Sequence, residues 1–257
     1  MPRQRKEPKP IQLKIPPKVE GIDRWIVFGL DPSLSRTGYS MMLVEPDENG
    51  THAKWLAVGS VKPDNSSDPV WVRSKAIALA ARERLESYVN SETAADPDCL
   101  KHTGLIISFE APTPGNDWLS TISRILHLVF FESANTDCYP EGGVCSEFAK
   151  VHVQMTNAAT LRRLMGLTER GRANKKENIA LAYTFLNKES YQNLDSDACD
   201  AVLMAMMAKY SASILLGFPD SVPERFRIAL CNSTEEVVGK GSREHTRVKG
   251  EEGMGKC

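Results

Sequence analysis

The sequence lacks the features that would assign it to a membrane, to the secretory route or to a zinc-binding class. It contains no apolar run of about 18 residues and no signal-peptide pattern, so we expect no membrane contact and a cytoplasmic location. Its six cysteines include no CxxC pair, which argues against a zinc knuckle and for reduced thiols.

An excess of charge of either sign is also missing, because 32 Lys and Arg residues face 33 Asp and Glu residues. This balance argues against a broadly basic surface. The distribution is uneven, however, since residues 1–18 hold six basic residues and one acid, Glu7. A basic segment with prolines and no apolar periodicity stays solvated, so we expect a disordered basic arm over residues 1–21.

Residues 22–218 carry regular apolar patterns and are predicted to form one domain with one sizeable core. Three strand candidates joined by turn-rich stretches indicate an antiparallel meander: Trp25–Leu30, Gly38–Glu45 and Trp55–Val61. Two further strands, GLIISFEA and KVHVQM, alternate with helical segments. The expected fold class is α/β, with a five-stranded mixed sheet flanked by helices. Residues 219–257 become Gly-rich and charged, and are predicted to be a disordered tail.

Four carboxylates occupy positions where buried elements begin or end. Asp31 and Glu110 each close a predicted strand, so their side chains emerge side by side if those strands are neighbours. Asp197 and Asp200 are three residues apart at the start of an apolar helix, which puts both on one face of its first turn. Each acid taken alone also fits a turn or a helix cap. Together, four converging carboxylates need cations, and oxygen ligands favour Mg²⁺, with Mn²⁺ as a substitute.

A basic segment lies between residues 162 and 176. Six cations stand there against one acid, Glu169: Arg162, Arg163, Arg170, Arg172, Lys175 and Lys176. A solvated helix face accounts for this composition, and so do contacts with DNA phosphates. Gly171 between two arginines favours the DNA interpretation, because a flexible loop can follow a phosphate backbone.

The order of four motifs resembles that of the RuvC-type Holliday-junction resolvases, including phage-type members. The motifs are GLDPSLSRTGY, ISFEAP, RANKKENI and DACDAVLMA, and the resemblance covers roughly residues 24–217. It implies an RNase H-like fold and a homodimeric, Mg²⁺-dependent endonuclease that makes paired symmetric nicks in a four-way DNA junction. The cytoplasm would then be that of a bacterium, or of its host if the chain is phage-encoded.

Residue by residue, the resemblance implies that Asp31, Glu110, Asp197 and Asp200 bind metal. Asp31 would bridge two Mg²⁺ ions, the other three acids would complete the shells, and Lys175 would stabilise charge on the scissile phosphate. Lys176 takes that role if the alignment slips by one position.

Two features depart from the family pattern or leave it ambiguous. The stretch APTPGNDW after Glu110 lacks the aromatic character that places a ring at the junction centre; Trp118 could substitute, although a Trp at a helix start is more often part of a core. Asp195 competes with Asp197 for the ligand role. The spacing of Asp197 and Asp200 favours that pair, and we interpret Asp195 as a helix cap or a group behind the ligands. The helix after Glu110 is our expected dimer interface.

Three other functions fit part of these observations. A non-catalytic junction-binding protein would use the acids structurally. An RNase H-like nuclease of broader specificity would also cut flaps, forks and other branched DNA. An actin-like ATPase would begin with a similar strand and Asp, but it needs a further glycine-rich phosphate loop that is missing at the expected place.

Overall fold

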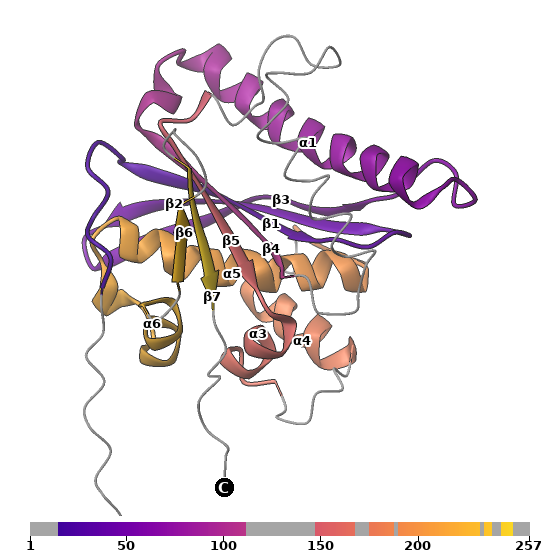
Figure 1. Ribbon diagram of the computed structural model, residues 1–257. Helices are drawn as coiled ribbons and strands as arrows, with labels where there is room; N and C mark the ends of the chain where they lie inside the picture. Colours follow the sequence, from indigo (N-terminus) through magenta and orange to yellow (C-terminus); the bar gives the residue numbers. More distant parts are fainter. Residues whose placement is uncertain are drawn as a thin grey trace, which may run out of the picture.

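A twisted sheet with helices on both faces organises the protein, as the computed structural model shows (Figure 1). The structure describes residues 15–111, 147–167, 175–187 and 190–231, and the backbone of two further strands at residues 234–237 and 243–248. The five strands that follow from the sequence lie in the order β3-β2-β1-β4-β5. Their bounds are Arg24–Asp31 for β1, Thr37–Asp47 for β2, Gly50–Val61 for β3, Thr103–Glu110 for β4 and Lys150–Thr156 for β5.

Strand direction agrees with the predicted fold class. The first three strands form an antiparallel meander, while β4 pairs with β1, and β5 with β4, in parallel. A mixed five-stranded sheet flanked by helices is therefore confirmed. Two more strands extend it beyond β5: β7 (Arg243–Val248) pairs in parallel with β5, and β6 (Thr234–Val237) pairs antiparallel with β7.

The helices divide between the two faces of the sheet. Helix α1 (Val70–Ala95), which precedes a short 3-10 turn at Cys99–His102, covers one face. Helix α5 (Ser196–Leu215) covers the other, together with α3 (Ala158–Leu164), α4 (Lys175–Phe185) and α6 (Glu224–Cys231). The sheet has a hydrophobic core on each face, one under α5 (the α5 core) and one under α1 (the α1 core). Side chains alternate along β1, so Val27 packs in the α5 core and Phe28 in the α1 core.

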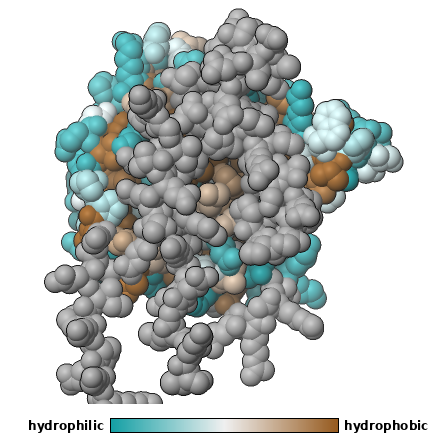
Figure 2. All heavy atoms as spheres, in the orientation of Figure 1, coloured by the Kyte–Doolittle hydropathy of each residue, from teal (hydrophilic) through white to brown (hydrophobic). Residues whose placement is uncertain are grey.

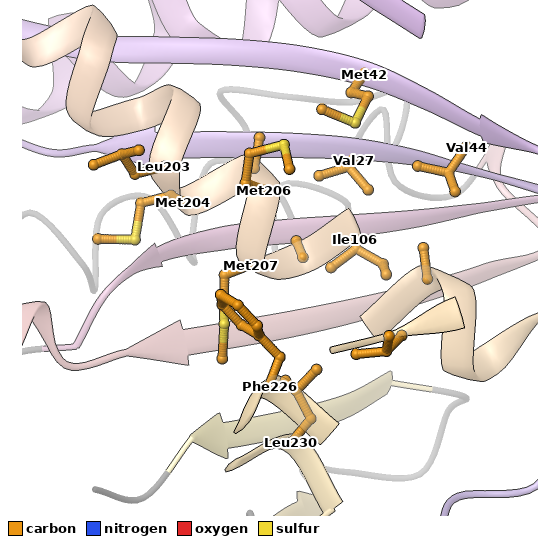
Figure 3. Packing of buried hydrophobic residues seen from close by; sticks show 14 of the residues in the cluster. Val27, Met42, Val44, Ile106, Leu203, Met204, Met206, Met207, Phe226 and Leu230 are labelled. Carbon is orange, nitrogen blue, oxygen red and sulfur yellow. The ribbon is translucent and has the colours of Figure 1, made fainter. Parts of the chain in front are cut away.

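Helix α5 is the central helix of the fold. It is the one helix in the described part of the chain that is long and apolar enough to cross a membrane, judged by length and composition alone. Most of it is buried inside the protein, as expected for a core helix, and Figure 3 shows its methionines among the strand residues Val27, Met42 and Ile106.

Both predicted disordered segments need correction at their inner ends. Val19, placed in the basic arm by the sequence, donates its backbone N–H to the Leu215 carbonyl, so the ordered chain begins before residue 22. The predicted tail from residue 219 is wrong for α6, because Phe226 and Leu230 are spaced four apart and bury one helix face in the α5 core (Figure 3). Its last part returns to the sheet as β6 and β7. Residues 1–14, and the predicted helix that contains Trp118, lie outside the described residues.

Two glycines bring α5 unusually close to the sheet. A Cβ added to Gly29 of β1 would lie 2.5 Å from the Ala201 carbonyl oxygen of α5, and one added to Gly38 of β2 would overlap the Asp197 carbonyl. Between them, the Ser40 hydroxyl donates to the Ala201 carbonyl at 2.7 Å. The start of α5 is therefore seated directly against the ends of β1 and β2.

We expect the Gly29→Ala substitution to destabilise the protein by about 3 kcal/mol, because the methyl group must displace helix backbone. Gly59→Ala is the matched control, since its added Cβ would meet the hydroxyl end of the Tyr39 side chain. Urea denaturation followed by circular dichroism measures both. Equal midpoints for the two variants would show that the close helix approach does not depend on Gly29.

Candidate active site

The sheet register brings Asp31 and Glu110 to the same edge. Strands β1 and β4 pair in parallel with Leu30 opposite Phe109, so the next residue on each strand, Asp31 and Glu110, ends its strand beside the other. Asp31 lies opposite Gly38 in the β1–β2 ladder. Because side chains alternate along a strand, Asp31 shares the face of Gly29, which is the face that α5 covers.

The first turn of α5 supplies the other two acids. The chain enters α5 through Asp195, whose side chain accepts the Ala198 backbone N–H at 2.9 Å and so caps the helix. Gly38 leaves room for the backbone at Asp197 to rest on β2, and Asp200 lies one turn further along α5. The four acids named from the sequence thus come together from β1, β4 and α5.

Asp195 has a structural role that the sequence left open. Besides capping α5, its carboxylate accepts hydrogen bonds from Arg36 at 2.8 Å and from the Ser60 hydroxyl at 2.6 Å. Together these contacts lower the Asp195 pKa, although its partial burial opposes them. Asp195 therefore ties the turn after Asp31, strand β3 and the start of α5 together, and its oxygens are already engaged.

Burial and mutual repulsion mark three of the four acids. Burial raises the pKa of Asp31 well above its usual value, and the neighbouring charges of Asp200, Glu110 and Asp197 raise it further. Burial is likewise the largest cause of the raised pKa values of Glu110 and Asp200. These carboxylates are ionised at neutral pH only at a cost in free energy, which a cation would remove.

Two residues of the predicted basic segment lie next to the acids. Arg162 of α3 lowers the pKa of Asp31, Glu110 and Asp200, so it is near all three. Lys175, exposed at the start of α4, lowers the pKa of Asp200. Arg163 and Lys176 are exposed, whereas Arg170 and Arg172 lie outside the described residues. Arg162 is therefore close enough to the carboxylates to act on their pKa values, whereas the sequence had left a solvated helix face and a DNA contact both open for it.

Asn178 was missed by the sequence interpretation. It is buried on α4, and its amide donates to Asp200 Oδ1 at 2.7 Å. The available signal was its position three residues after Lys175, which places both on one helix face. Asn178 and Lys175 together link α4 to Asp200.

Polar side chains also line the sheet behind Glu110. Ser108 lies two residues before Glu110 on the same face of β4, and Thr156 is the partner of Glu110 in the β4–β5 register. Both hydroxyls are buried without a hydrogen-bond partner among the described residues. Buried hydroxyls in this state indicate room for a further polar group, such as water, at this end of the sheet.

The donor set fits a hard divalent cation by its chemistry. It consists of carboxylate oxygens backed by unpaired hydroxyls, and its electrostatic cost is the kind that Mg²⁺ relieves. Within the described ranges, however, no group of three or more Asp, Glu, His or Cys side chains already stands in a metal-holding arrangement. The four acids would have to draw together around an ion.

Comparison with known proteins gives a likeness of fold. No family model matches the chain, and neither does any curated protein. Among solved structures it is similar to Thermus thermophilus RuvC, with 15% identity and a TM-score of 0.44 over 75% of this chain and 97% of that chain. It is also similar to T. thermophilus RuvC in complex with Holliday junction substrate, with 15% identity and a TM-score of 0.41 over 72% and 94%. A likeness at this identity concerns the arrangement of strands and helices and carries no information on substrate.

We expect Asp31→Asn to stabilise the metal-free protein at neutral pH, because it removes a buried charge that three acids repel. Since folding raises the Asp31 pKa above its ordinary value of 3.8, the unfolded state loses its proton first as the pH rises. The stability of the wild type relative to the variant should therefore fall above pH 3.8, until the folded-state pKa is passed. Chemical denaturation in EDTA at several pH values measures this difference, and a difference independent of pH would contradict it.

Asp195 offers a second test of the same region. Asp195→Ala removes the helix cap and both side-chain contacts and should cost about 1–2 kcal/mol, whereas Asp195→Asn keeps the cap and should cost less. Denaturation midpoints rank the two variants. If Asp195 rather than Asp197 were a metal ligand, Asp195→Asn would abolish metal-dependent activity and Asp197→Asn would spare it.

Proposed function

We propose that the protein is a metal-dependent endonuclease that hydrolyses phosphodiester bonds in branched DNA. The observation that carries this proposal is the convergence of four carboxylates from β1, β4 and α5. Three of them have pKa values raised by burial, with repulsion from neighbouring acids adding to the shift. Perturbed acids gathered at the end of a sheet are characteristic of catalytic sites, and this group includes more acids than turns and caps require.

Asp31, Glu110, Asp197 and Asp200 are the residues that would hold Mg²⁺ or Mn²⁺. When bound, such ions supply a Lewis acid for the phosphate and lower the pKa of a water molecule. Asp31 lies between Glu110 on β4 and the acids of α5, which makes it the natural shared ligand. Asn178 orients Asp200 through its hydrogen bond.

The two cations at the site differ in their exposure to solvent: Arg162 is half-buried and Lys175 is exposed. Arg162 is half-buried among three carboxylates and offsets part of their charge. Lys175 is exposed beside Asp200, where it can meet a phosphate that approaches from solvent. We assign Lys175 to stabilise the charge that develops on the phosphate during hydrolysis.

The finer proposal is resolution of four-way junctions by paired nicks. The motif order GLDPSLSRTGY, ISFEAP, RANKKENI and DACDAVLMA supports it, and a symmetric homodimer would present two such sites to opposed strands. A nuclease of broader specificity for flaps and forks, and a non-catalytic junction binder, remain the competing assignments that the experiment below separates.

The test uses labelled four-way junction, flap and linear duplex DNA with Mg²⁺ or EDTA. We expect symmetric, Mg²⁺-dependent nicks confined to the junction, and a loss of about a thousandfold in cleavage for Asp31→Asn with junction binding retained. Asp98→Asn is the matched control, because Asp98 is a surface acid paired with Lys101 and precedes the start of β4, whereas Glu110 ends that strand. Gel mapping of the nicks gives the readout.

The other results have distinct meanings. Equal cutting of flaps would assign a general branched-DNA nuclease, and binding without cutting would assign the non-catalytic protein. Wild-type cleavage by the Asp31→Asn variant would show that Asp31 is not a metal ligand.

A further inference from the structure

Among the described residues, one large aromatic side chain is strongly exposed. Trp71, the second residue of α1, is 63% exposed, and the neighbouring Val70 is 38% exposed. Tryptophan is usually well buried, because its ring has much apolar surface to remove from water. In Figure 2 the projecting region on the right of the view carries a small hydrophobic patch among hydrophilic residues. Such a ring is a candidate contact for a ligand with a flat apolar face.

Trp71 lies at the same edge of the sheet as the four carboxylates. Strand β3 ends at Val61, opposite Thr37, and the chain then enters α1 at this edge. Arg73 fixes the helix start there: its guanidinium donates to the Asp68 carbonyl at 3.0 Å and to the Leu34 carbonyl at 3.4 Å. Leu34 belongs to the turn that follows Asp31. Figure 1 shows the start of α1 projecting beyond the ends of β1 and β2.

The charge around Trp71 suits a polyanion. From Val70 to Ala81, α1 contains Arg73 and Lys75 and no acid, whereas the next cation, Arg82, is paired with Glu86. The N-terminus of α1 has no acidic residue in its first turn, so its helix dipole adds positive potential. Asp64 and Asp68 precede the helix, and Asp68 accepts a hydrogen bond from Asn65. An exposed ring beside exposed Lys75 offers both stacking and a phosphate contact.

We propose that Trp71 is a specificity-determining residue that stacks on an exposed base of branched DNA, with Lys75 on an adjacent phosphate. The proposal rests on the branched-DNA function proposed above and deepens it. In a linear duplex each base is covered by its neighbours, whereas a branch point can present an open base face. Aromatic stacking on such a base is independent of sequence, so Trp71 would favour branched over linear DNA without selecting a sequence.

The experiment measures binding of the full chain, in EDTA, to a four-way junction and to a linear duplex of the same arm sequence. A 2-aminopurine at the branch point reports stacking by its fluorescence. We expect Trp71→Ala to weaken junction binding about tenfold and to leave duplex binding unchanged, while Trp71→Phe keeps most of the affinity. Val70→Ala is the matched control, since it removes exposed apolar surface without removing a ring.

Three results would overturn the proposal. The first is unchanged junction affinity in Trp71→Ala, and the second is an equal loss for junction and duplex. The third is conversion of a dimer to a monomer by Trp71→Ala in light scattering, which would assign this surface to a second copy of the chain. The wild type distinguishes failure of this proposal from failure of the proposed function. If the wild type cuts junctions while Trp71→Ala binds them normally, only the role of Trp71 is wrong. If the wild type binds no branched DNA, both proposals are wrong.

Discussion

The close seating of α5 on β1 and β2 is the constraint on which the site depends. Gly29 and Gly38 present backbone without side chains to the helix, and Ser40 fixes the separation by donating to the Ala201 carbonyl. A larger residue at either glycine would lift the helix away from the sheet. The acids of α5 would then move away from Asp31, which lies opposite Gly38. Two absent side chains therefore set the spacing of the carboxylates.

The same seating works against stability. It places like charges in a partly buried region, where burial already raises the pKa values of Asp31, Glu110 and Asp200. Arg162 offsets part of this cost, and the two apolar cores on either side of the sheet hold the arrangement in place. The fold thus maintains a destabilising cluster, as is common for sites that bind a cation or a charged substrate.

Sequence patterns were sufficient for strands β1 to β5 and for the ends at which Asp31 and Glu110 lie, because alternation is a local property, but they missed β6 and β7. They were insufficient where a contact depends on packing of distant segments. Phe226 and Leu230 lie in a segment with charged residues, so the charged composition favoured a disordered tail over the apolar helix face that they form on α6. Arg162 reads as one of six similar cations, and only the path of the chain from β5 into α3 places it beside the acids. Asn178 is uncharged, so no charge pattern in the sequence marks it as a site residue, although its side chain donates a hydrogen bond to Asp200.

The return of the chain to the sheet after α6 has a consequence for assembly. Because β7 pairs with β5, the parallel core is not left with β5 as an open edge; the described sheet ends instead in β6, a strand of only four residues. So short an edge strand disfavours the addition of another strand. Self-association through this edge is therefore discouraged, and the long edge strand of the described sheet is β3, with 12 residues on the opposite side.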